Sequence, residues 1–310
     1  MNQNLRPRTL PFFHKLAFNM SSKGLSGSNF YWRVAYFLND VPDNQIVSLP
    51  SGFLIEPNKE DWTGRTIYEG TYERPLLKFL NHLIFSGLSI DVGANLGITL
   101  FHALRGNLLA SFVAFEPSLY CFHHLERLAQ NLTQSGNIVC AAVAEESGLR
   151  SLFDSDNKKH SGSASLNNYK GQKPSQENVQ VYSLDSYMDR NFGEHDVCIS
   201  LLKIDTEGFE KEVIAGAKEL IGKNTINVII LEVSPNFGDT EWIGELNGLL
   251  NDNYYWFEIS EVGLFRKKPI LRAITIEMVL QSKNQFNLTL INKLYPLNIK
   301  QIDTEIIYIK

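Results

Sequence analysis

Two short apolar segments of the sequence run directly into residues that bind small ligands in proteins. The first leads into Asp91-Val92-Gly93-Ala94-Asn95-Leu96-Gly97, and the second leads into Phe115-Glu116-Pro117. Glycine allows a tight turn and a close approach of the backbone to a ligand, and Asn tolerates a positive φ better than most residues. A carboxylate at the end of the second strand of a mononucleotide-binding fold accepts hydrogen bonds from ribose hydroxyls. We therefore predict that Glu116 binds a ribose.

The glycine-rich turn favours one class of nucleoside over another. A dinucleotide-binding turn has the pattern Gly-x-Gly-x-x-Gly and would place glycine at positions 95 and 98, where this chain has Asn95 and Ile98. Asp91 also precedes the turn, and an anion there opposes a diphosphate. A cationic sulfonium with an α-amino group tolerates that carboxylate. The turn therefore favours S-adenosylmethionine (SAM) over NAD as the cofactor.

Further carboxylates follow two later apolar segments. Asp205 and Glu207 come directly after residues 199–204, and Glu232 lies near the end of residues 226–233. A carboxylate at such a place can remove or orient the proton of a hydroxyl group. Asp205 and Glu232 could also share a Mg²⁺ ion, which prefers oxygen ligands. No third ligand is evident in the sequence, so we assign no metal ligands, and a metal site stays the less favoured of the two alternatives.

Alternating strand and helix patterns position these residues. Strands separated by helices indicate right-handed βαβ units and a parallel sheet with helices on both faces, and ligands bind at the carboxyl ends of its strands. The predicted strands are Leu88–Val92, Ser111–Phe115, Ile138–Val143, Ile199–Ile204 and Ile226–Val233, with Tyr254–Ile259 and Glu305–Ile309 at the far edge. Helices are predicted from Arg74-Pro75, over Ile98–Leu104, after a Ser118 cap, after an Asp185 cap, and through Val213–Ile221.

The composition is that of a folded globular chain. Of its 310 residues, 44% are hydrophobic and 20% are charged, and the formal net charge is -5. An acidic chain is poorly suited to binding phosphates over its whole surface, so we expect no nucleic-acid partner. No apolar run has the roughly 18 residues of a membrane span. The three cysteines are predicted to pack in the core, which suits a reducing, cytoplasmic location.

Three regions are predicted along the chain. Residues 1–60 form a basic and aromatic arm or cap, interpreted as flexible because Pro7 and Pro11 interrupt a helix. Residues 61–262 form the ligand-binding core, and residues 263–310 form an extension that completes the sheet. Within the core, the polar insertion 154–178 is a possible lid. It contains His160, which is either a catalytic base or a surface histidine.

The order of these motifs resembles that of the FkbM family of SAM-dependent methyltransferases. The resemblance covers roughly Leu88 to Val233, with Thr206 at a position where the family often has a small apolar residue. It is carried by Ile90-Asp91-Val92-Gly93-Ala94-Asn95-Leu96-Gly97, Ala114-Phe115-Glu116-Pro117-Ser118, Val181-Tyr182-Ser183-Leu184-Asp185, Leu202-Lys203-Ile204-Asp205-Thr206-Glu207-Gly208-Phe209-Glu210 and Val213-Ile214-Ala215-Gly216-Ala217.

The resemblance implies a Rossmann-like class I α/β fold with a mostly parallel seven-stranded sheet, and methyl transfer from SAM to a hydroxyl of a sugar, polyketide or similar metabolite. It implies that the turn around Gly93 passes beside the methionyl part of SAM. It places Ala142 and Val143 near the adenine. Glu73 is either a further cofactor contact or a helix N-terminal charge. Asp205 and Glu207 each have either a catalytic or a structural role. In the structural alternative, Glu207 accepts hydrogen bonds from backbone amides at the start of the following helix.

Two alternatives to methylation of a small hydroxyl acceptor remain at this stage. An NAD-dependent oxidoreductase is disfavoured by the missing glycines. A non-catalytic module that only binds SAM is disfavoured because the acidic residues at positions 91, 116, 205 and 207 are all present. The sequence does not identify the acceptor or the oligomeric state.

Overall fold

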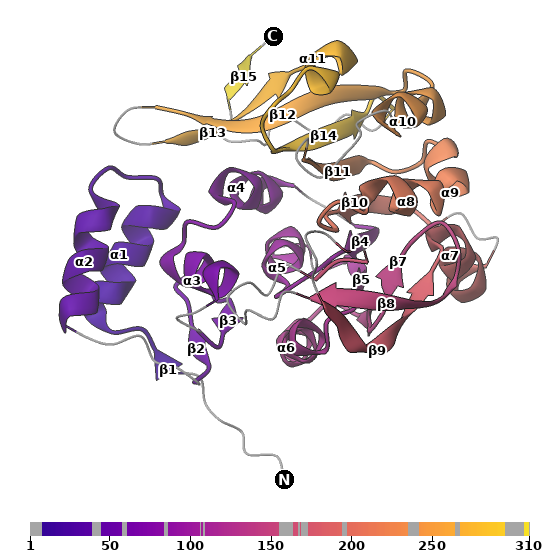
Figure 1. The fold of residues 1–310 in the computed structure, drawn as a ribbon. Coiled ribbons are helices and arrows are strands. Elements are labelled where there is room, and N and C mark those ends of the chain that lie inside the picture. Colours follow the sequence, from indigo (N-terminus) through magenta and orange to yellow (C-terminus); the bar gives the residue numbers. More distant parts are fainter. Residues whose placement is uncertain are drawn as a thin grey trace.

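A nine-stranded, mostly parallel sheet forms the centre of the computed structural model, in the order β15-β13-β12-β14-β11-β10-β4-β5-β6. Figure 1 shows helices on both sides of it. The structure describes residues 8–38, 45–57, 61–83, 86–105, 107, 109–154, 164–166, 168, 173–193, 197–234, 242–263, 267–294 and 307–309. The strands are β1 (Arg8–Thr9), β2 (Val47–Ser48), β3 (Leu54–Ile55), β4 (Leu88–Val92), β5 (Ser111–Phe115), β6 (Gly136–Val139), β7 (Ala142–Val143), β8 (Gly148–Asp154), β9 (Lys173–Tyr182), β10 (Ile199–Ile204), β11 (Val228–Val233), β12 (Tyr254–Val262), β13 (Lys268–Ala273), β14 (Phe286–Asn292) and β15 (Ile307–Ile309).

The chain has helices on both faces of the main sheet and in its N-terminal region. They are α1 (Phe12–Ser22), α2 (Ser28–Leu38), α3 (Trp62–Glu69), α4 (Arg74–His82), α5 (Ile98–Leu104), α6 (Leu119–Ala129), α7 (Leu184–Phe192), α8 (Glu210–Ala215), α9 (Lys218–Gly222), α10 (Trp242–Leu250) and α11 (Ile276–Leu280). One apolar core joins the sheet to α7, α8, α9 and α10. A second joins its other face to α4, α5 and α6. Burial of strands on both faces explains their nearly continuous apolar sequences.

The predicted fold class is confirmed, with a larger sheet than expected. Strands β6, β5, β4, β10 and β11 pair in parallel, and β14 and β12 follow in antiparallel pairing. Strand β15 matches the predicted strand Glu305–Ile309, whereas β13 and β14 were not predicted and raise the total from seven to nine. Sequence patterns missed β14, which lies between β11 and the expected edge strand β12.

Several predicted boundaries are wrong. The strand expected over Ile138–Val143 divides into β6 in the main sheet and β7 in a separate sheet with β8 and β9. Ser183 caps α7, whereas Asp185 accepts hydrogen bonds from the amides of Glu219 and Leu220 at α9. The helix expected through Val213–Ile221 divides into α8 and α9.

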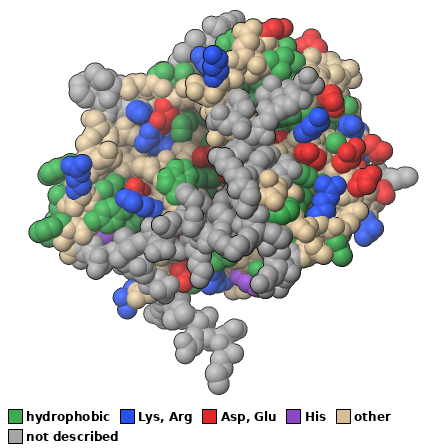
Figure 2. Space-filling model, in the orientation of Figure 1, with side chains coloured by type: hydrophobic (Ala, Val, Ile, Leu, Met, Phe, Trp, Pro, Cys, Tyr) green, Lys and Arg blue, Asp and Glu red, His purple; other side chains and the backbone are tan. Residues whose placement is uncertain are grey.

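The N-terminal region is folded, which corrects its interpretation as a flexible arm. Helices α1 and α2 pack against each other and share an apolar core with α3 and the β1-β2-β3 sheet. Pro11 stands at the N-cap of α1, where a missing amide proton costs nothing. Figure 2 shows apolar side chains on the surface at the left, over these two helices, and Phe12, Phe30 and Phe37 are exposed there.

Two further predictions concern burial of the cysteines and helices that could cross a membrane. Cys121 is buried as predicted, but Cys198 is exposed, so the prediction that all three cysteines pack in the core is wrong. Across the parts of the chain that the structure describes, no helix combines the length and apolar character needed to cross a membrane.

Candidate active site

The turn after β4 is shaped for close backbone contact. Gly93 has a φ of 77° and Asn95 has a φ of 49°, both in the left-handed region. The amides of Gly93 and Ala94 both donate to the carbonyl oxygen of Phe115 at 3.0 Å. A Cβ on Gly93 would lie 1.8 Å from the carbonyl oxygen of Asp205. The turn therefore requires glycine at position 93, because it is pressed against the end of β10.

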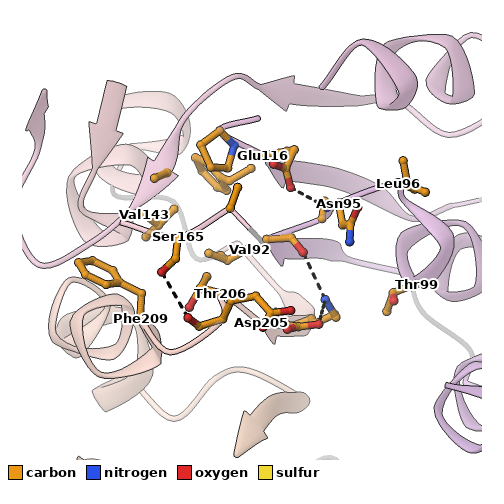
Figure 3. A pocket seen from close by; sticks show the side chains of 18 of the residues that line it. Val92, Asn95, Leu96, Thr99, Glu116, Val143, Ser165, Asp205, Thr206 and Phe209 are labelled. Carbon is orange, nitrogen blue, oxygen red and sulfur yellow. Dashed lines mark hydrogen bonds and ion pairs between the residues drawn. The ribbon is translucent and has the colours of Figure 1, made fainter. Parts of the chain in front are cut away.

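Glu116 is fixed by this turn. Its Oε2 accepts a hydrogen bond from the Asn95 amide at 2.7 Å, and its Oε1 accepts one from the Ser118 amide at 2.8 Å. Figure 3 shows the contact between Glu116 and Asn95 at one side of a cavity. Each carboxylate oxygen keeps a second lone pair that can accept a ribose hydroxyl. Glu116 is only 5% exposed, and this burial raises its pKa to about 7.

A buried lysine connects two neighbouring strands. Lys203 Nζ lies 3.0 Å from Asp205 Oδ2 and 3.4 Å from Asp91 Oδ1. The contacts follow from the pairing of β10 with β4, which sets Lys203 beside Asp91. Burial alone would lower the pKa of Lys203, but Asp205 and Asp91 outweigh it and the pKa rises. Lys203 is therefore a buried cation that forms ion pairs with both carboxylates.

Lys203 is a site residue that was not predicted from the sequence. A signal was available, since Lys203 is the one charged residue in the otherwise uncharged segment Ile199–Ile204. The same reasoning applies to Asp91 in β4 and Glu232 in β11, because every residue of these strands is buried. A charged residue in such a strand is retained only with a partner or a function.

Most of the predicted site residues meet at one cavity. It is lined by Gly93, Ala94, Asn95, Glu116, Pro117, Ala142, Val143, Asp205 and Glu207, together with Lys203 and Tyr72, which the sequence analysis did not assign. Figure 3 shows Asp205 and Thr206 at the edge of the cavity opposite Glu116. Asp91, Gly97 and Glu73 are not lining residues. Asp91 instead pairs with Lys203, and Gly97 caps α5. The predicted roles in binding and catalysis stay predictions.

The remaining space in the cavity is small. Its volume is about 70 Å³, whereas one water takes about 30 Å³ in the liquid. Ala164, Ser165 and Leu166 line it, and the Ser165 hydroxyl donates to the Glu207 carbonyl oxygen at 3.3 Å. This segment therefore lies at the wall of the cavity beside Glu207. His160 and most of the predicted lid lie outside the described residues.

A second groove of about 360 Å³ adjoins the first cavity. Ile67, Tyr72 and Ile98 line both spaces. The groove runs between α1 on one side and α4 and α5 on the other. This volume is in the range of sites for small molecules.

Glu207 remains available to a ligand. It was expected either to act on the substrate or to bind amides of the next helix, but Glu210 accepts the amides of Thr206 and Gly208 instead. Glu207 has a φ of 54° and lines the cavity. Burial, with the nearby charge of Asp205, raises its pKa to about 8. This value suits a general base near neutral pH.

A cluster of three carboxylates lies beside the cavity. One oxygen from each of Glu73, Asp205 and Glu232 lies within 4.8 Å of the others. Burial and then Asp205 raise the pKa of Glu73 to about 7 and that of Glu232 to about 10. These carboxylates are oxygen donors that could hold a cation, and Glu73 is the third acidic residue, which the sequence did not place beside Asp205 and Glu232.

Three solved structures with a similar fold are methyltransferases. A precorrin-6y C5,15-methyltransferase from Geobacter metallireducens is 10% identical, with 77% of this chain and 94% of that chain covered and a TM-score of 0.39. The magnesium protoporphyrin IX methyltransferase from Synechocystis PCC 6803, with bound SAM, is 10% identical, with coverage of 94% and 100% and a TM-score of 0.38. A SAM-dependent O-methyltransferase from Thermotoga maritima is 10% identical, with coverage of 83% and 81% and a TM-score of 0.35.

A family match is more informative than these likenesses. No curated protein matches the sequence. The methyltransferase FkbM domain matches residues 91–262, which include the glycine turn, Glu116, and both Asp205 and Glu207. This match covers more than half of the chain and replaces the oxidoreductase alternative. The chain belongs to the FkbM methyltransferase family, and its cofactor is S-adenosylmethionine.

Proposed function

We propose that this methyltransferase transfers the methyl group of SAM to a hydroxyl group of a sugar, polyketide or related small metabolite. The observation that carries the proposal is the position of Glu207 beside Asp205 at the end of β10, facing the cavity that Glu116 also lines. Glu210, rather than Glu207, accepts the amides of Thr206 and Gly208, and the pKa of Glu207, raised to about 8, suits removal of a hydroxyl proton.

In the proposed reaction, the acceptor oxygen attacks the methyl carbon in line with the sulfur. The new O–C bond forms as the S–C bond breaks, and the sulfonium becomes the neutral thioether of S-adenosylhomocysteine. Glu207 takes the proton of the acceptor hydroxyl. Asp205 forms an ion pair with Lys203 at 3.0 Å, so its proposed role is to orient the acceptor rather than to remove its proton.

The adjoining groove supports a small acceptor. Its volume of about 360 Å³ suits a metabolite, and its shared wall at Tyr72 would place that molecule beside the cofactor. The expectation that no nucleic acid binds is supported by the net charge of -5. On the face in Figure 2, Lys and Arg side chains are scattered among acidic ones rather than gathered in one patch.

The test compares acceptors that differ in one atom. The protein is incubated with SAM and a panel of sugars and polyketides, each paired with its amine analogue, and with RNA as a further arm. Mass spectrometry measures S-adenosylhomocysteine and the methylated product. We expect methylation of hydroxyl acceptors only. Methylation of the amines or of RNA alone would contradict the proposal, and release of no S-adenosylhomocysteine would favour the non-catalytic alternative.

A further inference from the structure

Three carboxylates from distant parts of the chain converge beside the cofactor cavity. Glu73 precedes α4, Asp205 follows β10, and Glu232 lies in β11. Each offers one oxygen within 4.8 Å of the other two. Ligands of one cation lie at most about twice the metal–oxygen distance apart, which is about 4.2 Å for Mg²⁺ and about 5 Å for Ca²⁺. The three oxygens are thus already close to the spacing of a shared cation.

Two of these carboxylates have an unsatisfied buried oxygen. Glu232 is 6% exposed, and its Oε2 has no hydrogen-bond partner among the described residues. Oε2 of Glu73 is likewise buried without a partner there. Buried polar atoms in native proteins almost always have partners, so two unsatisfied oxygens in one cluster indicate a missing ligand.

The other oxygen of each glutamate is held by an amide near β14. Asn287 Nδ2 donates to Glu73 Oε1 at 3.1 Å, and Gln285 Nε2 donates to Glu232 Oε1. Outer partners of this kind orient the ligands of metal sites. The arrangement leaves the second oxygen of each glutamate for a cation.

Lys203 offsets only part of the negative charge of the cluster. Its ion pairs are with Asp205 and Asp91, and among the described residues none is with Glu73 or Glu232. Buried carboxylates without a counter-charge are costly. A divalent cation would supply the charge that Lys203 does not.

We propose that Glu73, Asp205 and Glu232 bind a divalent cation that prefers oxygen ligands, such as Mg²⁺ or Mn²⁺. Because Asp205 also lines the cofactor cavity, the ion would lie at the edge of the space where the methyl group is transferred. The ion would bind the acceptor oxygen and favour loss of the acceptor's proton to Glu207, and this role rests on the proposed function. Binding of the ion does not depend on the proposed function.

The test measures metal binding directly. The full-length protein is stripped with a chelator and titrated with Mn²⁺, whose free form is followed by electron paramagnetic resonance. We expect one site that Mg²⁺ displaces. Glu232→Gln and Glu73→Gln should each weaken Mn²⁺ binding at least tenfold. Glu277→Gln, at an exposed position on α11, is the matched control and should bind as the unaltered protein does.

Three results would overturn the proposal. The first is no Mn²⁺ binding by protein whose circular dichroism is native. The second is equal binding by the Glu232→Gln and Glu277→Gln variants. The third is a protein that binds no Mn²⁺ and whose Glu73→Gln and Glu232→Gln variants both lose SAM affinity in the presence of chelator. That result would assign the cluster to binding the ammonium group of SAM.

The two proposals fail in different ways. Hydroxyl methylation at full rate in chelator would leave the proposed function intact and remove the metal. A single Mn²⁺ site in a protein that methylates no hydroxyl acceptor would leave the metal site intact and remove the proposed function.

Discussion

Lys203 Nζ lies 3.0 Å from Asp205 Oδ2, with Lys203 in the fully buried strand β10 and Asp205 directly after it, and the two side chains are 3% and 13% exposed. Lys293 Nζ lies at the same distance, 3.0 Å, from Asp252 Oδ1, but this second pair is on the surface, with side chains that are 33% and 95% exposed. The two pairs therefore differ in burial and not in distance.

This comparison predicts unequal effects of removing each lysine. Lys203→Met leaves Asp91 and Asp205 without their cation, which costs about 3–5 kcal/mol of folding free energy. Lys293→Met should cost about 0–1 kcal/mol. Urea unfolding of both variants measures the two losses. If the losses are equal, Lys203 does not support the site.

Glu116 is predicted to control cofactor affinity. Glu116→Ala removes acceptors for the ribose hydroxyls and for the Asn95 amide, and hydrogen bonds to charged groups contribute about 1.5–3 kcal/mol, so affinity should fall about tenfold or more. Calorimetry with S-adenosylhomocysteine measures the change. Glu126→Ala, at an exposed position on α6, is the control and should bind normally. Unchanged affinity in Glu116→Ala would remove the ribose assignment.

The pH dependence of turnover is predicted to follow Glu207. A base must be deprotonated, and the pKa of Glu207 is raised to about 8, so kcat should rise with pH and level off above about pH 8. Glu207→Gln should lower kcat and abolish this rise while leaving SAM affinity within about threefold of normal. A variant that keeps the pH profile would assign the base to another residue.

Gly93 is predicted to be irreplaceable. In Gly93→Ala, the new Cβ would meet the Asp205 carbonyl oxygen at 1.8 Å in a backbone with a φ of 77°. We expect a lower melting temperature and loss of cofactor binding. Gly148→Ala provides the control, because a Cβ there meets nothing within 4 Å. Equal melting temperatures for the two variants would contradict the tight packing of the turn against β10.

Because several carboxyl groups are buried, we predict that the metal-free protein loses stability as pH rises. Burial raises the pKa values of Glu73 and Glu116 to about 7 and that of Glu207 to about 8, above the unfolded value of about 4.3. Between these values the native state binds more protons than the unfolded state, so its stability falls with increasing pH. The melting temperature in chelator should be lower at about pH 8.5 than at about pH 6. A melting temperature that instead rises from about pH 6 to about pH 8.5 would show that these carboxyl groups are already charged below about pH 6.

The sequence alone determined the parallel sheet and most of the residues that line the candidate cavity. Periodicity placed β4, β5 and β10 accurately, because strands buried on both faces leave continuous apolar runs. The glycine turn and Glu116 follow those strands directly, so their place at the sheet edge came from chain order alone. Strand β14 was missed, since no pattern showed that a late segment inserts between β11 and β12.

Only the tertiary structure decided which charged groups share a site. Lys203 meets Asp91 because β10 pairs with β4, and Glu73 meets Glu232 although they are far apart in the chain. Such contacts depend on sheet register and helix packing, which local patterns do not encode. Periodicity reports which side of an element is buried, whereas the partner that each buried charge finds is set by the packing of the whole fold.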